Sequence, residues 1–270
     1  MTTTPDITHV DAPVGEAPGR RARIGLILLA TDFATEGELA RFLPDGRGAD
    51  ADVAWFTNRV PNTNPVTVAN LRAMGPELAR TAANILPGAR LDAIAYGCTS
   101  GTVVMGIDAA RAQIAQGRPD VPVTTPAIAA LAAFEALGVR RLSVFTPYSR
   151  DVNTAIAEFL IGHGCDIRAF ASFDLDTDEA MSGVPERAIA DAAARADRPD
   201  SDAVFISCTA LRAAGCAAEL EARLGKPVVT SNQAMFWHAL RLAGVSDAVA
   251  GRGMLLQRAL DGTPAAAGPG

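Results

Sequence analysis

The sequence predicts an α/β protein with two pseudo-symmetric lobes, each a parallel four-stranded sheet flanked by helices. First, short buried strands alternate with helical segments, which is typical of parallel sheets with right-handed crossovers. Second, this alternation restarts near residue 141. Third, one strand-and-turn motif occurs twice, as 92–99 (DAIAYGCT) and 202–209 (DAVFISCT), with the cysteines 110 residues apart. We therefore expect an active site in the cleft between two similar halves.

In the first part of the chain, apolar periodicity and turn residues predict the order strand, helix, strand, helix. Thr35 with Glu38 three residues later is typical of a capping box that opens the first helix. Gly138 predicts the end of the helix after the fourth strand. The predicted strands are 23–29, 52–57, 91–96 and 121–124, and the predicted helices are 35–43, 68–86, 102–116 and 126–137. A loop rich in Pro and Asn, 58–65, separates the second strand from its helix.

The second part of the chain repeats this order. Its predicted strands are 141–145, 166–173, 203–207 and 227–230, and its predicted helices are 150–162, 184–196, 211–224 and 253–260. We predict a disordered leader over 1–20, because this segment is rich in Thr, Pro and Gly and lacks an apolar run, and a loose tail over 262–270. The predicted lobes are 21–125 plus 232–261, and 126–231.

Composition and charge exclude several classes of function. The net charge is −6 and the sequence contains no stripe of basic residues, so nucleic acid is not an expected partner. The longest apolar runs, such as 24–30, are too short for a bilayer span, so no membrane is expected. The first 20 residues do not resemble a secretory signal, and we expect a cytoplasmic protein whose four cysteines are free thiols. No Cys-x-x-Cys occurs and only three histidines are present, which disfavours a metal site.

Four polar residues fall at predicted carboxyl ends of strands, where ligands of parallel sheets bind: Asp32, Cys98, Tyr148 and Cys208. A thiol at the start of a helix is favoured as thiolate by the helix dipole and by free amide groups. Two such thiols on opposite walls could exchange protons with both faces of one carbon. Alternatively, one thiolate could add to an activated double bond, allow rotation and leave again.

The residues beside Cys98 suit an anion. Thr99, Ser100 and Thr102 offer hydroxyls, and the glycines at 97 and 101 let backbone amides approach closely. A carboxylate held there could spread the charge that develops when an α-proton leaves. The same glycines also suit a phosphate loop, but the Gly-Lys-Ser/Thr ending is missing.

Structural interpretations compete with these functional ones. A cysteine at a strand end often only packs in the core as a small hydrophobic residue. The repetition of the motif makes this structural interpretation weaker here. Tyr148 is equally compatible with an ordinary turn, and Asp32 with helix capping. Cys165 and Cys216 lack the motif and are expected to be structural, and His238 lies on an apolar helical face typical of a core.

Residues 23–260 resemble the aspartate/glutamate racemase superfamily, in its branch of arylmalonate decarboxylase, maleate cis-trans isomerase and ectoine-utilisation racemase-like proteins. The segments 29–36 and 96–102 look most like the ectoine-utilisation group. The resemblance implies no metal or organic cofactor, homo-oligomers such as dimers or tetramers, and catalytic positions at Cys98 and Cys208. It also implies that Thr99, Ser100 and Tyr148 hold a carboxylate. The decarboxylase has glycine where this chain has Cys98, and maleate isomerases usually follow the first cysteine with apolar residues.

The leading hypothesis is a cofactor-independent racemase or epimerase of a small carboxylate-bearing substrate, an aspartate- or diaminobutyrate-like amino acid being the example that the resemblance suggests. Cys98 and Cys208 would be its acid/base pair. The substrate-binding residues would be Thr99, Ser100, Tyr148, Thr209 and Asp32. The alternatives are a maleate-type cis-trans isomerase with a covalent cysteine adduct, an arylmalonate-type decarboxylase, and a small-acid binding protein without catalysis.

Overall fold

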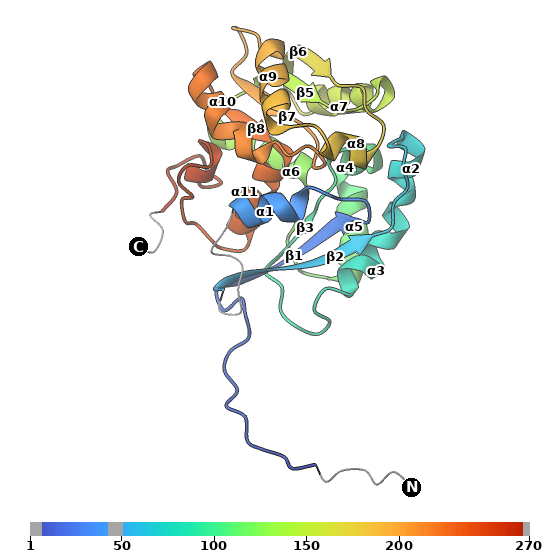
Figure 1. The fold of residues 1–270 in the computed structure, drawn as a ribbon, viewed down its shortest axis with the longest axis vertical. Helices are drawn as coiled ribbons and strands as arrows, with labels where there is room; N and C mark the ends of the chain where they lie inside the picture. Colours follow the sequence, from blue (N-terminus) through green and yellow to red (C-terminus); the bar gives the residue numbers. More distant parts are fainter. Residues whose placement is uncertain (1–6, 43–50, 267–270) are drawn as a thin grey trace.

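The computed structural model describes residues 7–42 and 51–266. They form two parallel sheets of four strands, with strand orders β2-β1-β3-β4 and β6-β5-β7-β8. The predicted two-lobed α/β fold is therefore confirmed, and Figure 1 shows the two sheets with their helices on either side. The strands of the first sheet are β1 Ala22–Leu29, β2 Val53–Val60, β3 Ala93–Tyr96 and β4 Val123–Thr124; those of the second are β5 Arg141–Thr146, β6 Asp166–Ser172, β7 Ala203–Ile206 and β8 Val228–Thr230.

The two sheets share one topology. In each, the first strand of the lobe pairs with the second on one side and with the cysteine strand on the other. The cysteine strands β3 and β7 are therefore central and fully buried, which explains their continuous apolar sequences. Their carboxyl ends, where the two cysteines follow, are the places at which parallel sheets offer ligand sites.

The helices around the first sheet are α1 Thr35–Phe42, α2 Val68–Ala73, α3 Leu78–Ala83, α4 Thr99–Met105 and α5 Ile107–Gly117, with the 3₁₀ helix η2 Gly75–Glu77. The helix predicted over 68–86 is thus divided, because Pro76 cannot donate a backbone hydrogen bond within a helix. The helix predicted from residue 102 begins at Thr99 and is interrupted at Gly106, whose φ of +89° is left-handed.

The second half contains α6 Pro126–Leu137, α7 Arg150–Gly162, α8 Asp178–Ser182, α9 Glu186–Ala196, η3 Ala214–Cys216, α10 Ala217–Leu224, α11 Ser231–Leu242 and η4 Leu255–Gln257. The bounds predicted for α6 and α7 are confirmed, including the left-handed Gly138 after α6. Helix α8 was not predicted. The helix predicted from residue 211 begins only at Ala217, after η3.

One prediction near the C-terminus is wrong. The helix expected over 253–260 is only the single turn η4, because left-handed glycines at 251 and 253 precede it and Arg258 pairs with Pro264 instead. Within the tail predicted over 262–270, Ala266 bridges Asp247; residues 267–270 lie outside the described residues, and the loose tail stays a prediction. The leader predicted over 1–20 has neither helix nor strand between residues 7 and 20. The lobe boundaries themselves stay a prediction.

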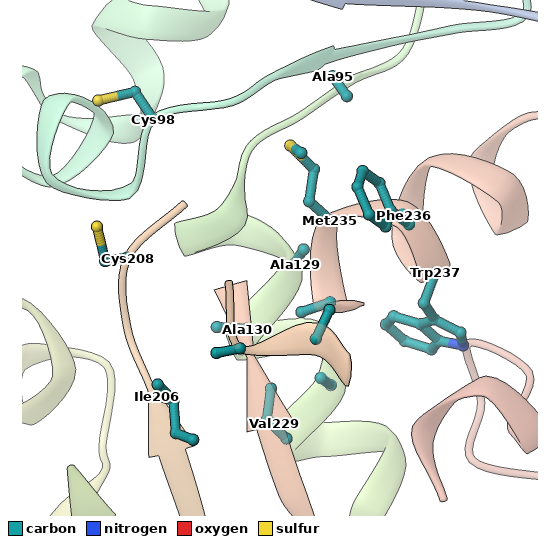
Figure 2. Packing of buried hydrophobic residues seen from close by; sticks show 14 of the residues in the cluster. Ala95, Cys98, Ala129, Ala130, Ile206, Cys208, Val229, Met235, Phe236 and Trp237 are labelled. Carbon is teal, nitrogen blue, oxygen red and sulfur yellow. The ribbon is translucent and has the colours of Figure 1, made fainter. Parts of the chain in front are cut away.

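Helices α6 and α11 pack side by side between the two sheets. Almost every residue of α11 is buried, including the large side chains of Phe236 and Trp237. Figure 2 shows Met235, Phe236 and Trp237 of α11 beside Ala129 and Ala130 of α6, next to the strands β3 and β7. The small alanines allow this close approach, so the core that joins the lobes also holds the two cysteine strands in place. In the described part of the chain, no helix has the length and apolar character that crossing a bilayer would require.

Candidate active site

Cys98 is positioned by the turn from β3 into α4. Its backbone is extended (φ −145°, ψ 109°) and it is the N-cap of α4, where its Sγ accepts a hydrogen bond from the Gly101 amide at 3.2 Å. The Thr102 hydroxyl donates to the Cys98 carbonyl at 2.7 Å. Gly97 beside it leaves room for Leu28, because a Cβ at residue 97 would lie 2.8 Å from the Leu28 side chain and would force it to move. The motif therefore places the thiol at a helix start, as predicted.

Cys208 follows β7 in the corresponding place but in different surroundings. Its Sγ accepts a hydrogen bond from the Ala210 amide at 3.3 Å and lies 3.9 Å from the Met181 sulfur of α8. No helix begins at this cysteine, so the expected helix start is wrong for the second thiol. Figure 2 shows the two cysteines on facing segments, with the Cys208 sulfur directed toward the segment that carries Cys98.

Hydrogen bonds connect the two motifs directly. The Ser231 hydroxyl, in the first turn of α11, lies 2.9 Å from the Thr99 hydroxyl and accepts the Cys208 amide at 3.0 Å. The Thr209 hydroxyl donates to the Gly97 carbonyl at 3.2 Å. All these groups are buried. The relative position of the thiols is thus fixed by buried hydrogen bonds, which are costly to break.

Both thiols line one cavity of about 20 Å³, which is room for about one water molecule. Five of the seven residues predicted for the site lie in its wall, and eight further residues complete it. The lining residues are Leu29, Asn62, Thr63, Val66, Asn70, Leu71, Met74, Cys98, Ser100, Tyr148, Asp178, Cys208 and Thr209. A carboxylic acid is larger than this cavity, so substrate entry requires its walls to move.

Two of the predicted residues are not in the wall. The Thr99 hydroxyl is directed toward Ser231. Asp32 accepts hydrogen bonds from the amides of Ala34 and Thr35 and from the Thr35 hydroxyl, at 2.7 to 2.9 Å. Asp32 is therefore placed as a capping residue at the start of α1, the competing interpretation from the sequence, and the structure does not bring it to the cavity.

Sequence reasoning missed the part of the wall that comes from the loop after β2 and from α8. Asn62 and Thr63 belong to the Pro/Asn-rich segment 58–65, and Val66 follows it; the composition of the segment predicted a loop but not where the loop lies. The Val66 amide donates to the Asp176 carbonyl at 2.7 Å, and the Asp178 amide donates to Asn64 Oδ1 at 3.3 Å. Loops from both halves of the chain are thus joined over the thiols.

Tyr148, just after β5, is buried and lines the same cavity as the two thiols. Burial and the nearby thiols raise its pKa well above the usual value, so its hydroxyl is neutral, and a hydrogen bond from Tyr148 lowers the pKa of Cys208. Ser100 interacts with both the Tyr148 hydroxyl and the Cys98 sulfur, which lies 3.9 Å from Ser100 Oγ. Neutral hydroxyl donors of this kind suit a carboxylate or a developing enolate.

Burial opposes the ionisation of both thiols. It raises the pKa of Cys98 to about 11 and that of Cys208 to about 12, and the charge of Asp178 adds to both increases. The Gly101 amide lowers the pKa of Cys98, and the amides of Leu211 and Ala210 lower that of Cys208, as the sequence led us to expect, but by less than burial raises them. The closed cavity therefore holds two neutral thiols rather than a resting thiolate.

The other cysteines and histidines have structural surroundings. Cys216 is buried in η3 with its thiol near the Ala213 carbonyl, and Cys165 is half-buried. His238 Nδ1 lies 2.7 Å from the Thr124 hydroxyl, and burial lowers the His238 pKa to about 4. Within 7–42 and 51–266, no three His, Cys, Asp or Glu side chains gather as the ligands of a metal ion would.

Comparison with known proteins places this arrangement in a family. The sequence profile of the arylmalonate decarboxylase family matches residues 79–256, more than half of the chain and including both cysteine motifs. The chain belongs to the arylmalonate decarboxylase family. The predicted superfamily branch is thereby confirmed.

Individual members of this branch differ in how much of the chain they match. Arylmalonate decarboxylase from Bordetella bronchiseptica is 40% identical over 126 residues, which are 46% of this chain and only about half, 52%, of that protein. Maleate isomerase from Pseudomonas putida is 24% identical over 88% of this chain and 98% of its own length. Both similar proteins are enzymes, and their activities are those of the alternative hypotheses rather than of a racemase.

Solved structures of the family share the fold. A glycine-to-cysteine, cysteine-to-serine double variant of arylmalonate decarboxylase in the liganded form has a TM-score of 0.77 at 29% identity, covering 87% of this chain and 98% of its own. A cysteine-to-serine variant of Nocardia farcinica maleate cis-trans isomerase, with a covalently bound succinylcysteine intermediate, also has a TM-score of 0.77, at 24% identity and with coverage of 87% and 98%.

Proposed function

We propose that this member of the arylmalonate decarboxylase family is a cis-trans isomerase of a small unsaturated carboxylic acid of the maleate type, acting through a covalent adduct on Cys98. The observation that carries the proposal is the pair of thiols in one closed cavity, with Cys98 capping α4 and Cys208 opposite. The isomerase relatives match this chain over nearly their whole length, which supports the same assignment.

The reaction begins with the Cys98 thiolate, which adds to one alkene carbon. As the C–S bond forms, the π bond breaks and its electron pair moves to the adjacent carbon and into the attached carboxylate. The Cys208 thiol donates its proton to that carbon, which gives a saturated thioether. Rotation about the new C–C single bond follows. Cys208 then takes the proton back, the double bond re-forms in the trans arrangement, and Cys98 leaves as thiolate.

The hydroxyl groups of the cavity supply the donors for the charged intermediate. Ser100, Tyr148 and Thr209 lie in the wall beside the thiols and would bind the carboxylate oxygens. Since burial raises the pKa of Cys98 to about 11, thiolate is the minor form near neutrality. We therefore expect kcat/KM to rise about tenfold per pH unit from about pH 7 to about pH 9.

Two-thiol proton transfer, that is racemisation or epimerisation, is a second candidate. It is favoured by the equivalent placement of two neutral thiols at the ends of β3 and β7, one for each face of a carbon. Both candidates assign the same residues and differ in whether a C–S bond forms.

Proton NMR in D₂O distinguishes these functions. The panel contains maleate, its monoamide maleamate, aspartate, diaminobutyrate and an arylmalonate. We expect conversion of a cis-alkene acid to its trans isomer, with an adduct on Cys98 seen by intact mass in the Cys208→Ser variant. Deuterium at an α-carbon with loss of optical activity and no adduct would establish racemisation instead. Loss of a carboxyl group would establish decarboxylation, and binding without turnover a small-acid binding protein.

A further inference from the structure

The cavity has a single charged wall residue among the residues that the structure describes. Asp178, the first residue of α8, is that residue, and no lysine, arginine or histidine lies beside it in the lining. Its neighbours in the wall are polar but neutral, such as Asn62, Thr63 and Asn70. A substrate that reacts at the thiols therefore shares the cavity with an acid.

Contacts with the first half of the chain hold this carboxylate by one oxygen. Asp178 Oδ2 accepts a hydrogen bond from the Thr31 hydroxyl and one from Asn62 Nδ2 at 3.4 Å, and Asn62 Nδ2 also donates to the Thr31 hydroxyl at 2.7 Å. No donor among the described residues reaches Asp178 Oδ1. The residue is only 4% exposed. An almost buried carboxylate with one oxygen unpartnered is a ready acceptor for a ligand group.

The charge of Asp178 is felt at the reacting sulfurs. It contributes to the raised pKa of both Cys98 and Cys208, whose thiols line the same cavity, and burial raises the pKa of Asp178 itself. A second carboxylate at the far end of a substrate would meet the same repulsion. A donor group there would instead form a charge-assisted hydrogen bond with the free oxygen.

We infer that Asp178 determines specificity by selecting a substrate that carries an N–H donor, an amide or an ammonium group, at the end opposite its reacting carboxylate. The natural substrate is then a monocarboxylate with a nitrogen-bearing end rather than a dicarboxylate. This inference rests on the proposed function for which end of the cavity reacts, but it concerns binding and can be tested without turnover.

The test uses saturated acids, which have no double bond to isomerise. Wild-type protein is alkylated with iodoacetamide in the presence of succinate, succinamate or 4-aminobutyrate, and protection of Cys98 and Cys208 is followed by peptide mass spectrometry. The variant is Asp178→Asn, which keeps an acceptor for Thr31 and turns a donor toward the cavity. Asp176→Asn is the matched control, since it removes the same charge from an exposed position two residues earlier. Protection is expressed as the alkylation rate with the acid divided by the alkylation rate of the same protein without it.

We expect wild type and Asp176→Asn to be protected by succinamate or 4-aminobutyrate at concentrations at least about tenfold lower than by succinate, a factor typical of one charge-assisted hydrogen bond. Preference for succinamate would identify an amide as the donor, and preference for 4-aminobutyrate an ammonium group. Asp178→Asn should reverse the order in favour of succinate.

Equal protection by all three acids, unchanged in Asp178→Asn, would overturn the inference and leave the proposed isomerisation standing. Conversely, the predicted reversal without isomerisation of maleate or maleamate would remove the proposed function and leave the role of Asp178 intact. If no acid protects either thiol, the cavity does not bind carboxylates and both proposals fail.

Discussion

The two cysteine motifs are alike up to the cysteine and differ after it. Each follows a central strand of its sheet. The Cys98 sulfur accepts the Gly101 amide, and the Cys208 sulfur accepts the Ala210 amide and is also stabilised by the Leu211 amide. After Cys98 a helix begins at once, whereas after Cys208 the chain has no helix until η3. The third residue after the cysteine is Gly101 in the first motif and Leu211 in the second. The repeated strands thus determine where the thiols lie, and the residues that follow determine what each thiol can do.

Replacing each thiol in turn tests most strongly whether the two motifs have different roles. We expect Cys98→Ala to lose all isomerisation and all adduct, because the proposed roles make Cys98 the nucleophile and leave Cys208, the other thiol in the cavity wall, only as the proton donor. Cys208→Ser should lower kcat by about 10²–10⁴-fold, the usual contribution of a general acid, while still forming an adduct on Cys98. Turnover and intact mass are measured on both variants. An adduct on Cys208 in the Cys98→Ala variant would reverse the assigned roles.

The glycine after Cys98 offers a smaller perturbation of the same motif. In Gly101→Ala the new Cβ would lie 2.7 Å from the Cys98 sulfur and 2.9 Å from the Tyr96 hydroxyl, too close for either to stay. We expect kcat to fall by about 10²-fold, a cost typical of misplacing a reacting group by about 1 Å. Gly37→Ala in α1 is the control, because a Cβ there meets nothing within 4 Å. Unchanged turnover in Gly101→Ala would show that the thiol position tolerates movement.

The contact between the motifs can be broken at Ser231. Ser231→Ala leaves the Thr99 hydroxyl and the Cys208 amide without their partner. We expect a loss of about 1–3 kcal/mol in the free energy of unfolding, measured by urea denaturation, and a fall in kcat of about tenfold. Ser207→Ala serves as the control in the second motif, since no partner for the buried Ser207 hydroxyl is found among the described residues. A similar loss in both variants would indicate general core damage instead.

The strands of both sheets and the positions of the two thiols could be predicted from the sequence. A buried central strand is a local apolar run, and turn residues mark its end. Helix starts were less predictable where local propensity competed with tertiary contacts. Residues 211–216 have helical composition, yet Thr209 and the first residue of η3, Ala214, are used to contact the first half of the chain. Asp178 and Asn62 could not be found from the sequence, because they meet through loop packing between residues 116 positions apart. Asp32 was predicted to bind substrate because of its position at a strand end. Its hydrogen bonds with Thr35 instead make it a capping residue of α1.

A change at Glu38 should have the smallest effect on the second motif, because Glu38 contacts this motif only through Asn232 and Ala214. This buried carboxyl accepts hydrogen bonds from the Ala214 amide at 2.8 Å and from Asn232 Nδ2 at 2.6 Å, and Asn232 also donates to the Thr209 carbonyl beside Cys208. Asn232 Oδ1 has no partner among the described residues. Burial raises the pKa of Glu38 from 4.5 to about 7, more than these hydrogen bonds lower it. The second motif is therefore linked to a group that titrates near neutrality.

The sign of the resulting pH dependence follows from proton binding. Between the ordinary glutamate pKa of 4.5 and about 7, the folded protein holds the Glu38 proton and the unfolded chain has released it, so stability falls as pH rises through this window. The loss amounts to about 3 kcal/mol and is complete above the folded pKa. Glu38→Gln should abolish this slope in urea denaturation at successive pH values while changing turnover little, since the amide can donate to Asn232 Oδ1. Glu36→Gln, on the exposed side of the same helix, should keep the wild-type slope. If the free energy of unfolding depends on pH in the same way in wild type and in Glu38→Gln, the proton on Glu38 does not stabilise the fold. The link from α1 to the Cys208 motif would then be independent of Glu38 protonation.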